Sequence, residues 1–290
     1  MFFDEEMLLD LRLNIMNKYV DKFVITEASY MHSGKSKKLI FDINKYSKFK
    51  DKIIYNVIDE QPSNIETLSE NDDKETRGRK LINNSNKREH YQREMAQKSL
   101  DAAGPDDIIL INDVDEIPNL KGVDFKKINK KIIIFKQKMF YYKFNLLYET
   151  FPWHGSRACK KKFFKTPQWL RNAKYKKYPI WRIDIFFSNM KYNNIHYVEN
   201  GGWHFTNMKS PENLEKKFLN FLHHQDFETS GLKLENIKEM VKNKKIIYDL
   251  DVDQKDYKWK GTKKLSKVPL SEMPDYLSNN YKKYSNWLEI

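Results

Sequence analysis

Hydrophobic and polar positions follow helical spacing and then strand spacing over the first part of the chain. Apolar residues recur every three or four positions over 7–20 and predict a helix. Short apolar runs at 22–26 and 52–58 then predict two strands. The pattern is therefore typical of a chain that mixes helices and strands along its length.

A polar stretch without periodicity separates these elements from the next helix. We interpret 59–87 as a long surface loop, and we expect a helix over 88–103 that ends at Gly104-Pro105. Four apolar residues between carboxylates follow within 106–113, which is the pattern of a central strand buried on both faces. Strand, helix and strand in this order predict a parallel α/β sheet.

The second half of the chain is rich in aromatic and β-branched residues. Strands and long loops are predicted over 131–147 and 181–205, and Ser210-Pro211 has the residues that start a helix. A last amphipathic helix is predicted within 271–288. The sequence contains no internal repeat and no linker-like stretch, so one compact domain over 1–290 is the simplest organisation.

Composition narrows the class of protein. Of the 290 residues 40% are hydrophobic, which is enough to form a sizeable core. The single cysteine, Cys159, excludes a disulfide scaffold and a cysteine-based zinc site. The apolar runs are far shorter than the ~18 residues of a membrane span, and the acidic start differs from a signal peptide. We therefore expect a soluble, cytoplasmic protein.

The charge balance is strongly positive. The chain has 53 Lys and Arg residues against 40 Asp and Glu residues, a formal charge of +13. Nucleic acid, an anionic small molecule and an anionic membrane surface are all partners that fit such an excess, and biased coding also enriches lysine.

One stretch imitates a phosphate-binding loop. Ser33-Gly34-Lys35-Ser36 follows a predicted strand, as the end of a P-loop would. That motif needs a glycine five positions before Gly34, and the residue there is Ser29. The P-loop interpretation is therefore rejected.

The strongest candidate for chemistry is the acidic motif over 112–118. It places Asp113 and Asp115 one residue apart, directly after the predicted buried strand. Ligands bind at this edge of open α/β sheets, and two carboxylates there can hold Mg²⁺ or Mn²⁺ together with a diphosphate and water. The alternative is a solvent-exposed acidic turn.

This motif resembles the corresponding segment of glycosyltransferase family 17. The resemblance continues in order along most of the chain, and its further stretches are Glu6–Leu13, Val20–Ser29, Ser33–Lys35, Trp153–Ser156, Gly201–Phe205 and Pro274–Asn280. The aspartate motif and Gly-Trp-His, in the correct order, are together specific.

The resemblance implies a fold and an activity. The implied fold is a GT-A-like α/β/α sandwich with a mostly parallel central sheet, in which 1–125 form the nucleotide-sugar half and 126–290 the acceptor half with the C-terminal helices. The implied activity is transfer of a sugar from a UDP-sugar, with UDP-GlcNAc as the expected donor, Mn²⁺ or Mg²⁺ as cofactor and inversion at the anomeric carbon.

The resemblance also implies roles for particular residues. Asp113 and Asp115 would bind the metal ion and the UDP diphosphate, and His204 would complete the metal ligands. The alternative for His204 is a hydrogen-bonded core residue. The remaining residues of the donor site would be Glu27, Ser33, Gly34, Lys35 and Arg93.

Inverting transfer needs a general base that deprotonates the acceptor hydroxyl. A carboxylate of the second half is required, and the candidates are Glu149, Asp184, Glu199 and Asp226. Trp153, Trp181 and Trp203 are candidate platforms for sugar rings.

Family members usually begin with a short strand just before the Phe-Phe-x-Glu stretch, whereas Met1 directly precedes Phe2-Phe3. We therefore expect either a start further upstream or an incomplete sheet on the nucleotide side.

The expected partners are a sugar donor and a saccharide acceptor, without nucleic acid. Lipid-linked or surface-polysaccharide precursors are the expected acceptors, at the inner membrane face, with peripheral contact to anionic lipid. The alternatives are a nucleotidyltransferase at the same metal site, a catalytically degenerate glycan-binding protein and a basic nucleic-acid-binding protein.

Overall fold

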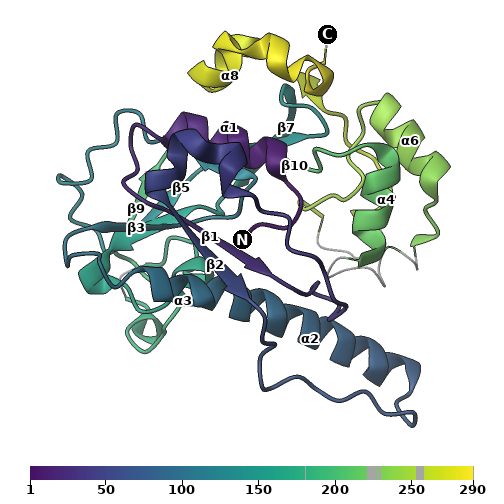
Figure 1. Ribbon diagram of the computed structural model, residues 1–290, viewed down its shortest axis with the longest axis horizontal. Helices are drawn as coiled ribbons and strands as arrows, with labels where there is room; N and C mark the ends of the chain where they lie inside the picture. Colours follow the sequence, from purple (N-terminus) through teal and green to yellow (C-terminus); the bar gives the residue numbers. More distant parts are fainter. Residues whose placement is uncertain (180, 221–226, 228–229, 253–257, 290) are drawn as a thin grey trace.

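A computed structural model describes residues 1–179, 181–220, 227, 230–252 and 258–289 (Figure 1). The strands of this part of the chain form three sheets. The smallest is the parallel pair β1 (Phe23–Ala28) and β2 (Ile53–Ile58). The four-stranded sheet has the order β3 (Ile108–Ile111), β8 (Arg157–Lys160), β5 (Ile132–Phe135) and β9 (Ile195–Val198). The five-stranded sheet has the order β11 (Ser266–Lys267), β7 (Leu146–Trp153), β6 (Gln137–Tyr141), β10 (Gly202–Thr206) and β4 (Glu116–Pro118).

Both larger sheets mix strand directions, so the prediction of a mostly parallel central sheet is wrong. The pairs β5–β9 and β6–β10 are parallel, whereas β8 runs antiparallel to β3 and β5, and β7 runs antiparallel to β6. β3 is an edge strand of its sheet, and only Ile109 in it is buried. A strand was predicted here correctly, but the prediction of a central strand buried on both faces is wrong. Its partner β8 comes much later in the chain, and the local sequence pattern cannot reveal such a pairing.

Helices cover the sheets on several sides (Figure 1). The α-helices are α1 (Glu6–Met16), α2 (Lys74–Glu94), α3 (Pro167–Asn172), α4 (Pro211–Asn220), α6 (Leu234–Lys242) and α8 (Asp275–Asn279). The 3₁₀ segments are Ile43–Lys52, Met95–Ser99, Lys161–Phe163, Ile183–Ile185, Leu270–Glu272 and Tyr281–Trp287. Within the described ranges, no helix is long and apolar enough to cross a bilayer.

Helix α2 differs from the prediction. It begins inside the stretch expected to be a loop, where Asp73 caps it by accepting a hydrogen bond from the Thr76 amide at 2.7 Å. It ends at Glu94, and the predicted helix over 88–103 continues only as a 3₁₀ turn. The helix buries mainly polar side chains, Asn84, Ser85, Arg88, Gln92 and Arg93. A buried face of this composition has no apolar periodicity, so the sequence pattern did not reveal it.

The largest hydrophobic core combines both halves of the chain. Leu11 and Leu13 of α1 pack in it with Phe140, Phe205 and, near the C-terminus, Leu277, all of them fully buried. A second core lies between α4, α6 and the strand β7 and includes Leu214, Phe218 and Ile237. Cys159 is buried in a third, smaller core beneath α3.

A cavity of about 1070 Å³ separates β1 from β3. Within the described part of the chain β1 pairs only with β2, and β3 pairs only with β8. The cavity walls are mostly apolar and include Val24, Ile25, Ile109 and Leu110.

Candidate active site

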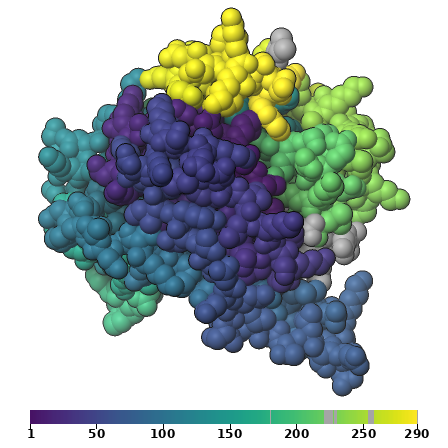
Figure 2. Space-filling model, viewed as in Figure 1, coloured from purple at the N-terminus to yellow at the C-terminus, as the bar shows by residue number. Residues whose placement is uncertain are grey.

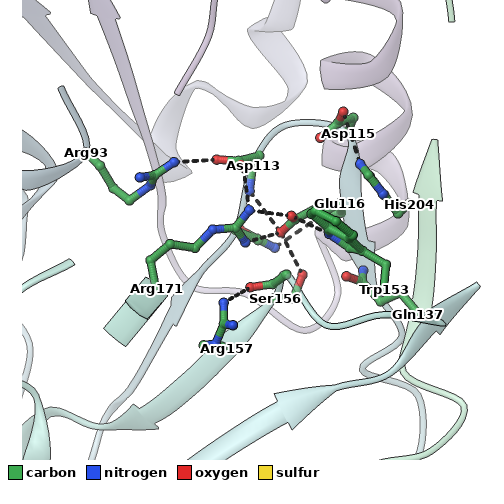
Figure 3. A network of polar contacts seen from close by, with 12 residues as sticks. Arg93, Asp113, Asp115, Glu116, Gln137, Trp153, Ser156, Arg157, Arg171 and His204 are labelled. Carbon is green, nitrogen blue, oxygen red and sulfur yellow. Dashed lines mark hydrogen bonds and ion pairs between the residues drawn. The ribbon is translucent and has the colours of Figure 1, made fainter. Parts of the chain in front are cut away.

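The acidic motif forms the turn between β3 and β4, and its side chains Asp113, Asp115 and Glu116 contact residues of other elements (Figure 3). An arginine of α1 fixes the backbone of this turn. Arg12 of α1 donates hydrogen bonds to the carbonyl oxygens of Asp113 at 3.1 Å and Glu116 at 2.6 Å, and also to the Asn112 side chain. Burial lowers the pKa of Arg12 to about 10 in spite of the three nearby carboxylates. The turn is therefore held by the side chain of Arg12 and differs from a solvent-exposed acidic turn.

Two guanidinium groups hold Asp113. Arg93 at the end of α2 contacts its Oδ1 at 3.3 Å, and Arg171 of α3 contacts its Oδ2 at 2.7 Å. Burial by itself would raise the pKa of Asp113, but Arg171 and Arg93 outweigh it and hold this pKa well below its usual range. Arg93 also contacts Glu89 Oε1 at 2.7 Å, so its guanidinium group pairs with a carboxylate of its own helix as well as with the aspartate of the motif.

Glu116 is the centre of the hydrogen-bond network, although it was not among the predicted site residues. It is 1% exposed, and it accepts bonds from Arg171 at 2.7 and 2.9 Å and from Trp153 Nε1 at 2.6 Å. Gly155 makes room for this arrangement, because a Cβ there would lie 1.9 Å from Glu116 Oε1. The role of Glu116 is to orient Arg171 and Trp153 from inside the protein.

Asp115 lies beside a histidine of strand β10. Nε2 of His204, on β10, lies 3.4 Å from Asp115 Oδ2, and the His204 ring stacks on Trp153 with centroids 4.5 Å apart. His204 is 5% exposed, and its Nδ1 has no hydrogen-bond partner among the described residues. Burial raises the pKa of Asp115, but the charge and hydrogen bond of His204 outweigh it and lower this pKa. The structure thus brings His204 next to Asp115, and its role as a metal ligand stays a prediction.

Lys217 adds a cation that the sequence did not indicate. It lies on α4 and donates a hydrogen bond to Asn207 Oδ1 at 2.8 Å. Burial lowers its pKa, and the charges of Asp115 and Glu5 oppose that effect. No local motif marks Lys217 or Arg171, because each reaches the site from a helix distant in sequence.

Glu27 was predicted to contact the nucleotide, but its carboxylate binds other parts of the chain. It is fully buried and accepts bonds from the amides of Ile40 at 2.9 Å and Phe41 at 3.1 Å, from the Tyr55 hydroxyl at 2.9 Å and from Lys37. Burial raises the pKa of Glu27, and these donors, Lys37 first, lower it overall. In this arrangement Glu27 fastens the segment that follows the Ser33–Lys35 turn onto β1.

The turn of Ser33, Gly34 and Lys35 packs on α2. Gly34 has a φ of +90°, and a Cβ there would lie 2.6 Å from the Arg88 guanidinium. Ser33 Oγ is buried without a hydrogen-bond partner among the described residues, whereas Lys35 is exposed. Ser33 therefore offers a buried hydroxyl that no described residue uses.

The candidate bases do not join the network. Glu149 is exposed on β7, Asp184 pairs with Arg182, and Glu199, whose side chain is 68% exposed, pairs with Lys136. None of these three carboxylates bonds to Asp113, Asp115 or His204. The fourth candidate, Asp226, lies outside the described residues, as do the neighbouring His223 and His224.

A metal ion would find only part of a ligand set here. In the described ranges no three His, Cys, Asp or Glu side chains are placed to hold one ion. Asp115 and His204 are adjacent, but both oxygen atoms of Asp113 contact guanidinium groups. Mg²⁺ and Mn²⁺ commonly use one or two protein ligands and take the others from phosphates and water. Asp115 and His204 fit that kind of site.

The fold and the site define a mixed α/β protein with clustered carboxylates and cations at the end of a strand. A family model, Glycosyltransferase family 17, matches residues 1–289. The chain therefore belongs to glycosyltransferase family 17 and is a glycosyltransferase. No curated protein and no solved structure matched it.

Proposed function

We propose that this enzyme transfers a sugar from a UDP-sugar to a glycan or lipid-linked saccharide. The proposed sugar is GlcNAc, the cofactor is Mn²⁺ or Mg²⁺, and transfer inverts the anomeric carbon. The observation that carries the proposal is the cluster around the acidic turn, where Asp113 and Asp115 lie among Arg93, Arg171 and Lys217. Such a cluster suits a ligand that is itself a metal-bound diphosphate, because it offers both anions and cations. A GT-A-like arrangement is part of the proposal.

In the proposed complex Asp115 and His204 are the first metal ligands. When bound, the metal ion would neutralise charge on the departing UDP. Asp113 would also hold the metal ion, and Arg93 and Arg171 would bind phosphate oxygens of the UDP. Guanidinium groups suit that role because their paired N–H donors match phosphate oxygens as well as carboxylates.

The sugar would lie near Trp153. Gln137, which pairs with Trp153 across β6 and β7, is 1% exposed, and its Oε1 has no partner in the described part of the chain. Unpaired buried polar atoms such as Gln137 Oε1 and His204 Nδ1 are costly unless a ligand or water satisfies them. We assign them to the hydroxyls of the donor sugar or the acceptor.

For the base, Glu149 is a better candidate than Asp184 or Glu199. Hydrogen bonds from Arg182 and Lys191 lower the pKa of Asp184, and a hydrogen bond from Lys136 lowers that of Glu199. A carboxylate with a lowered pKa is a weaker proton acceptor. Glu149 forms no such ion pair within the described ranges.

The test of the metal and donor site is Asp115→Asn. This change keeps the shape of the side chain and removes its charge. We expect it to weaken Mn²⁺-dependent UDP binding, measured by titration calorimetry with and without Mn²⁺, by at least about tenfold. Asp184→Asn is the matched control, because Asp184 is an exposed aspartate away from the site, and it should bind UDP as the wild type does.

Unchanged Mn²⁺-dependent binding in Asp115→Asn would contradict the proposed site. A panel of UDP- and GDP-sugars, scored for hydrolysis without acceptor, then identifies the donor. Release of pyrophosphate from nucleoside triphosphates in place of sugar release would favour a nucleotidyltransferase.

A further inference from the structure

Residues 174–192, which we call the aromatic loop, expose large apolar side chains. Trp181, Ile183, Phe186 and Phe187 have exposed fractions of 82%, 71%, 70% and 85%. The loop follows α3 and projects at the lower left of the molecule in Figures 1 and 2. Soluble proteins rarely gather exposed apolar side chains in this way unless the surface contacts a partner.

The loop has a defined base. The Lys174 amide donates to the Met190 carbonyl at 2.7 Å, which closes the loop where it leaves the protein. Tyr197 donates to the Tyr175 carbonyl at 2.5 Å. At the tip, Ile185 is the buried side chain, 6% exposed, and turns inward while its neighbours turn outward. The exposed side chains therefore belong to a loop whose base is closed by hydrogen bonds.

The charges of the loop are almost all positive. Its cations are Lys174, Lys176, Lys177, Arg182 and Lys191. Its one acid, Asp184, forms ion pairs at 2.7 Å with both Arg182 and Lys191. The acid is thereby engaged within the loop, and the surface around the apolar tip keeps an excess of positive charge.

We propose that the aromatic loop docks the protein onto an anionic lipid bilayer. Trp181, Phe186 and Phe187 would enter the interfacial region, where aromatic rings are favoured, and the lysines would contact lipid phosphates. A protein partner of apolar surface would leave the lysines without a role, and a nucleic acid would leave Ile183 and the two phenylalanines in water. A bilayer with negative headgroups accommodates both features.

The experiment uses the whole protein and vesicles, without donor or acceptor, so that its outcome is independent of the sugar-transfer reaction. Binding to vesicles of phosphatidylglycerol and phosphatidylcholine is compared with binding to phosphatidylcholine alone by co-sedimentation. We expect binding only with the anionic lipid. Phe186→Ser combined with Phe187→Ser should lower the partition coefficient at least about tenfold, and Lys176→Glu with Lys177→Glu by about fivefold or more for each residue.

Matched controls keep the test specific. Tyr281→Ser removes a half-exposed aromatic side chain next to Lys282 and Lys283. It belongs to the segment after α8, and α8 lies far from the aromatic loop in Figure 1, so this variant should bind as the wild type does. Brominated lipids should quench the tryptophan fluorescence of the wild type more than that of Trp181→Phe. Absence of wild-type binding to anionic vesicles would overturn the proposal, and so would full binding by the double phenylalanine variant. A wild-type dimer that this variant converts to monomer would assign the patch to a second copy of the chain.

Discussion

Arg171→Ala is expected to lower the free energy of unfolding by about 3–5 kcal/mol. Arg171 contacts Glu116 and Asp113, each at 2.7 Å, and its side chain is 14% exposed. Without it, Glu116 would remain as a buried carboxylate without its cation, and the cost of burying an unpaired charge exceeds the value of the pair itself. Urea unfolding followed by circular dichroism measures the change.

Arg182→Ala is the matched control for this prediction. Arg182 also pairs with a carboxylate, Asp184, at 2.7 Å, but both side chains are exposed to solvent. Its loss should leave the unfolding midpoint unchanged. Replacing Arg171 by Met together with Glu116 by Gln should recover part of the stability, since the unpaired charge is then removed as well. Equal midpoints for Arg171→Ala and the wild type would show that the network does not stabilise the fold.

Gly202→Ala should destabilise the protein by about 3 kcal/mol or more, the sum of backbone strain and steric overlap. Gly202 has a φ of +118°, and a Cβ there would lie 2.2 Å from the Ile117 carbonyl oxygen and 2.5 Å from the Asn119 amide nitrogen. Both atoms belong to backbone, so no side chain can move aside. Thermal unfolding monitored by calorimetry gives the loss.

Gly122→Ala separates the two causes. Gly122 also has a positive φ, +78°, but nothing lies within 4 Å of the position of its Cβ. Its substitution should cost only the conformational term, about 1–2 kcal/mol. A loss at Gly202 no greater than that at Gly122 would show that β4 and β10 separate easily. His204 follows two residues after Gly202 on β10, so we also expect Gly202→Ala to weaken Mn²⁺-dependent UDP binding.

The sequence predicted those parts of the fold that depend on local pattern. The strand at 22–26 and that at 52–58 form the parallel pair β1 and β2, and the helix over 7–20 is α1. The same pattern could not predict the antiparallel partner of β3, since strand pairing depends on residues far apart in the chain. The helical first part of α2 was missed, because a helix that buries amides, hydroxyls and guanidinium groups looks like a loop in a hydrophobicity pattern.

Only part of the candidate site could be predicted, again because the sequence shows local motifs and not contacts between distant segments. Asp113, Asp115 and His204 belong to short motifs, and the structure places them together. Arg171 and Lys217 belong to no motif, and they reach the site only because α3 and α4 pack beside it. Glu27 was assigned to the donor site by the resemblance, yet its carboxylate accepts hydrogen bonds from the chain's own backbone.

The cavity between β1 and β3 also has a consequence for local unfolding. The backbone of β1 and β2 bonds to few other elements in the described part of the chain, with Phe2 donating to the Thr26 carbonyl at 2.8 Å. Regions with few such attachments open as cooperative units at a lower free energy than the whole protein. Glu27 and the turn at Ser33 are tied to this pair, so both would loosen with it while Asp113, Glu116 and Arg171 stay joined. A ligand that contacts both the Ser33 turn and the Asp113 turn would therefore couple the opening of β1 and β2 to the unfolding of the rest of the protein.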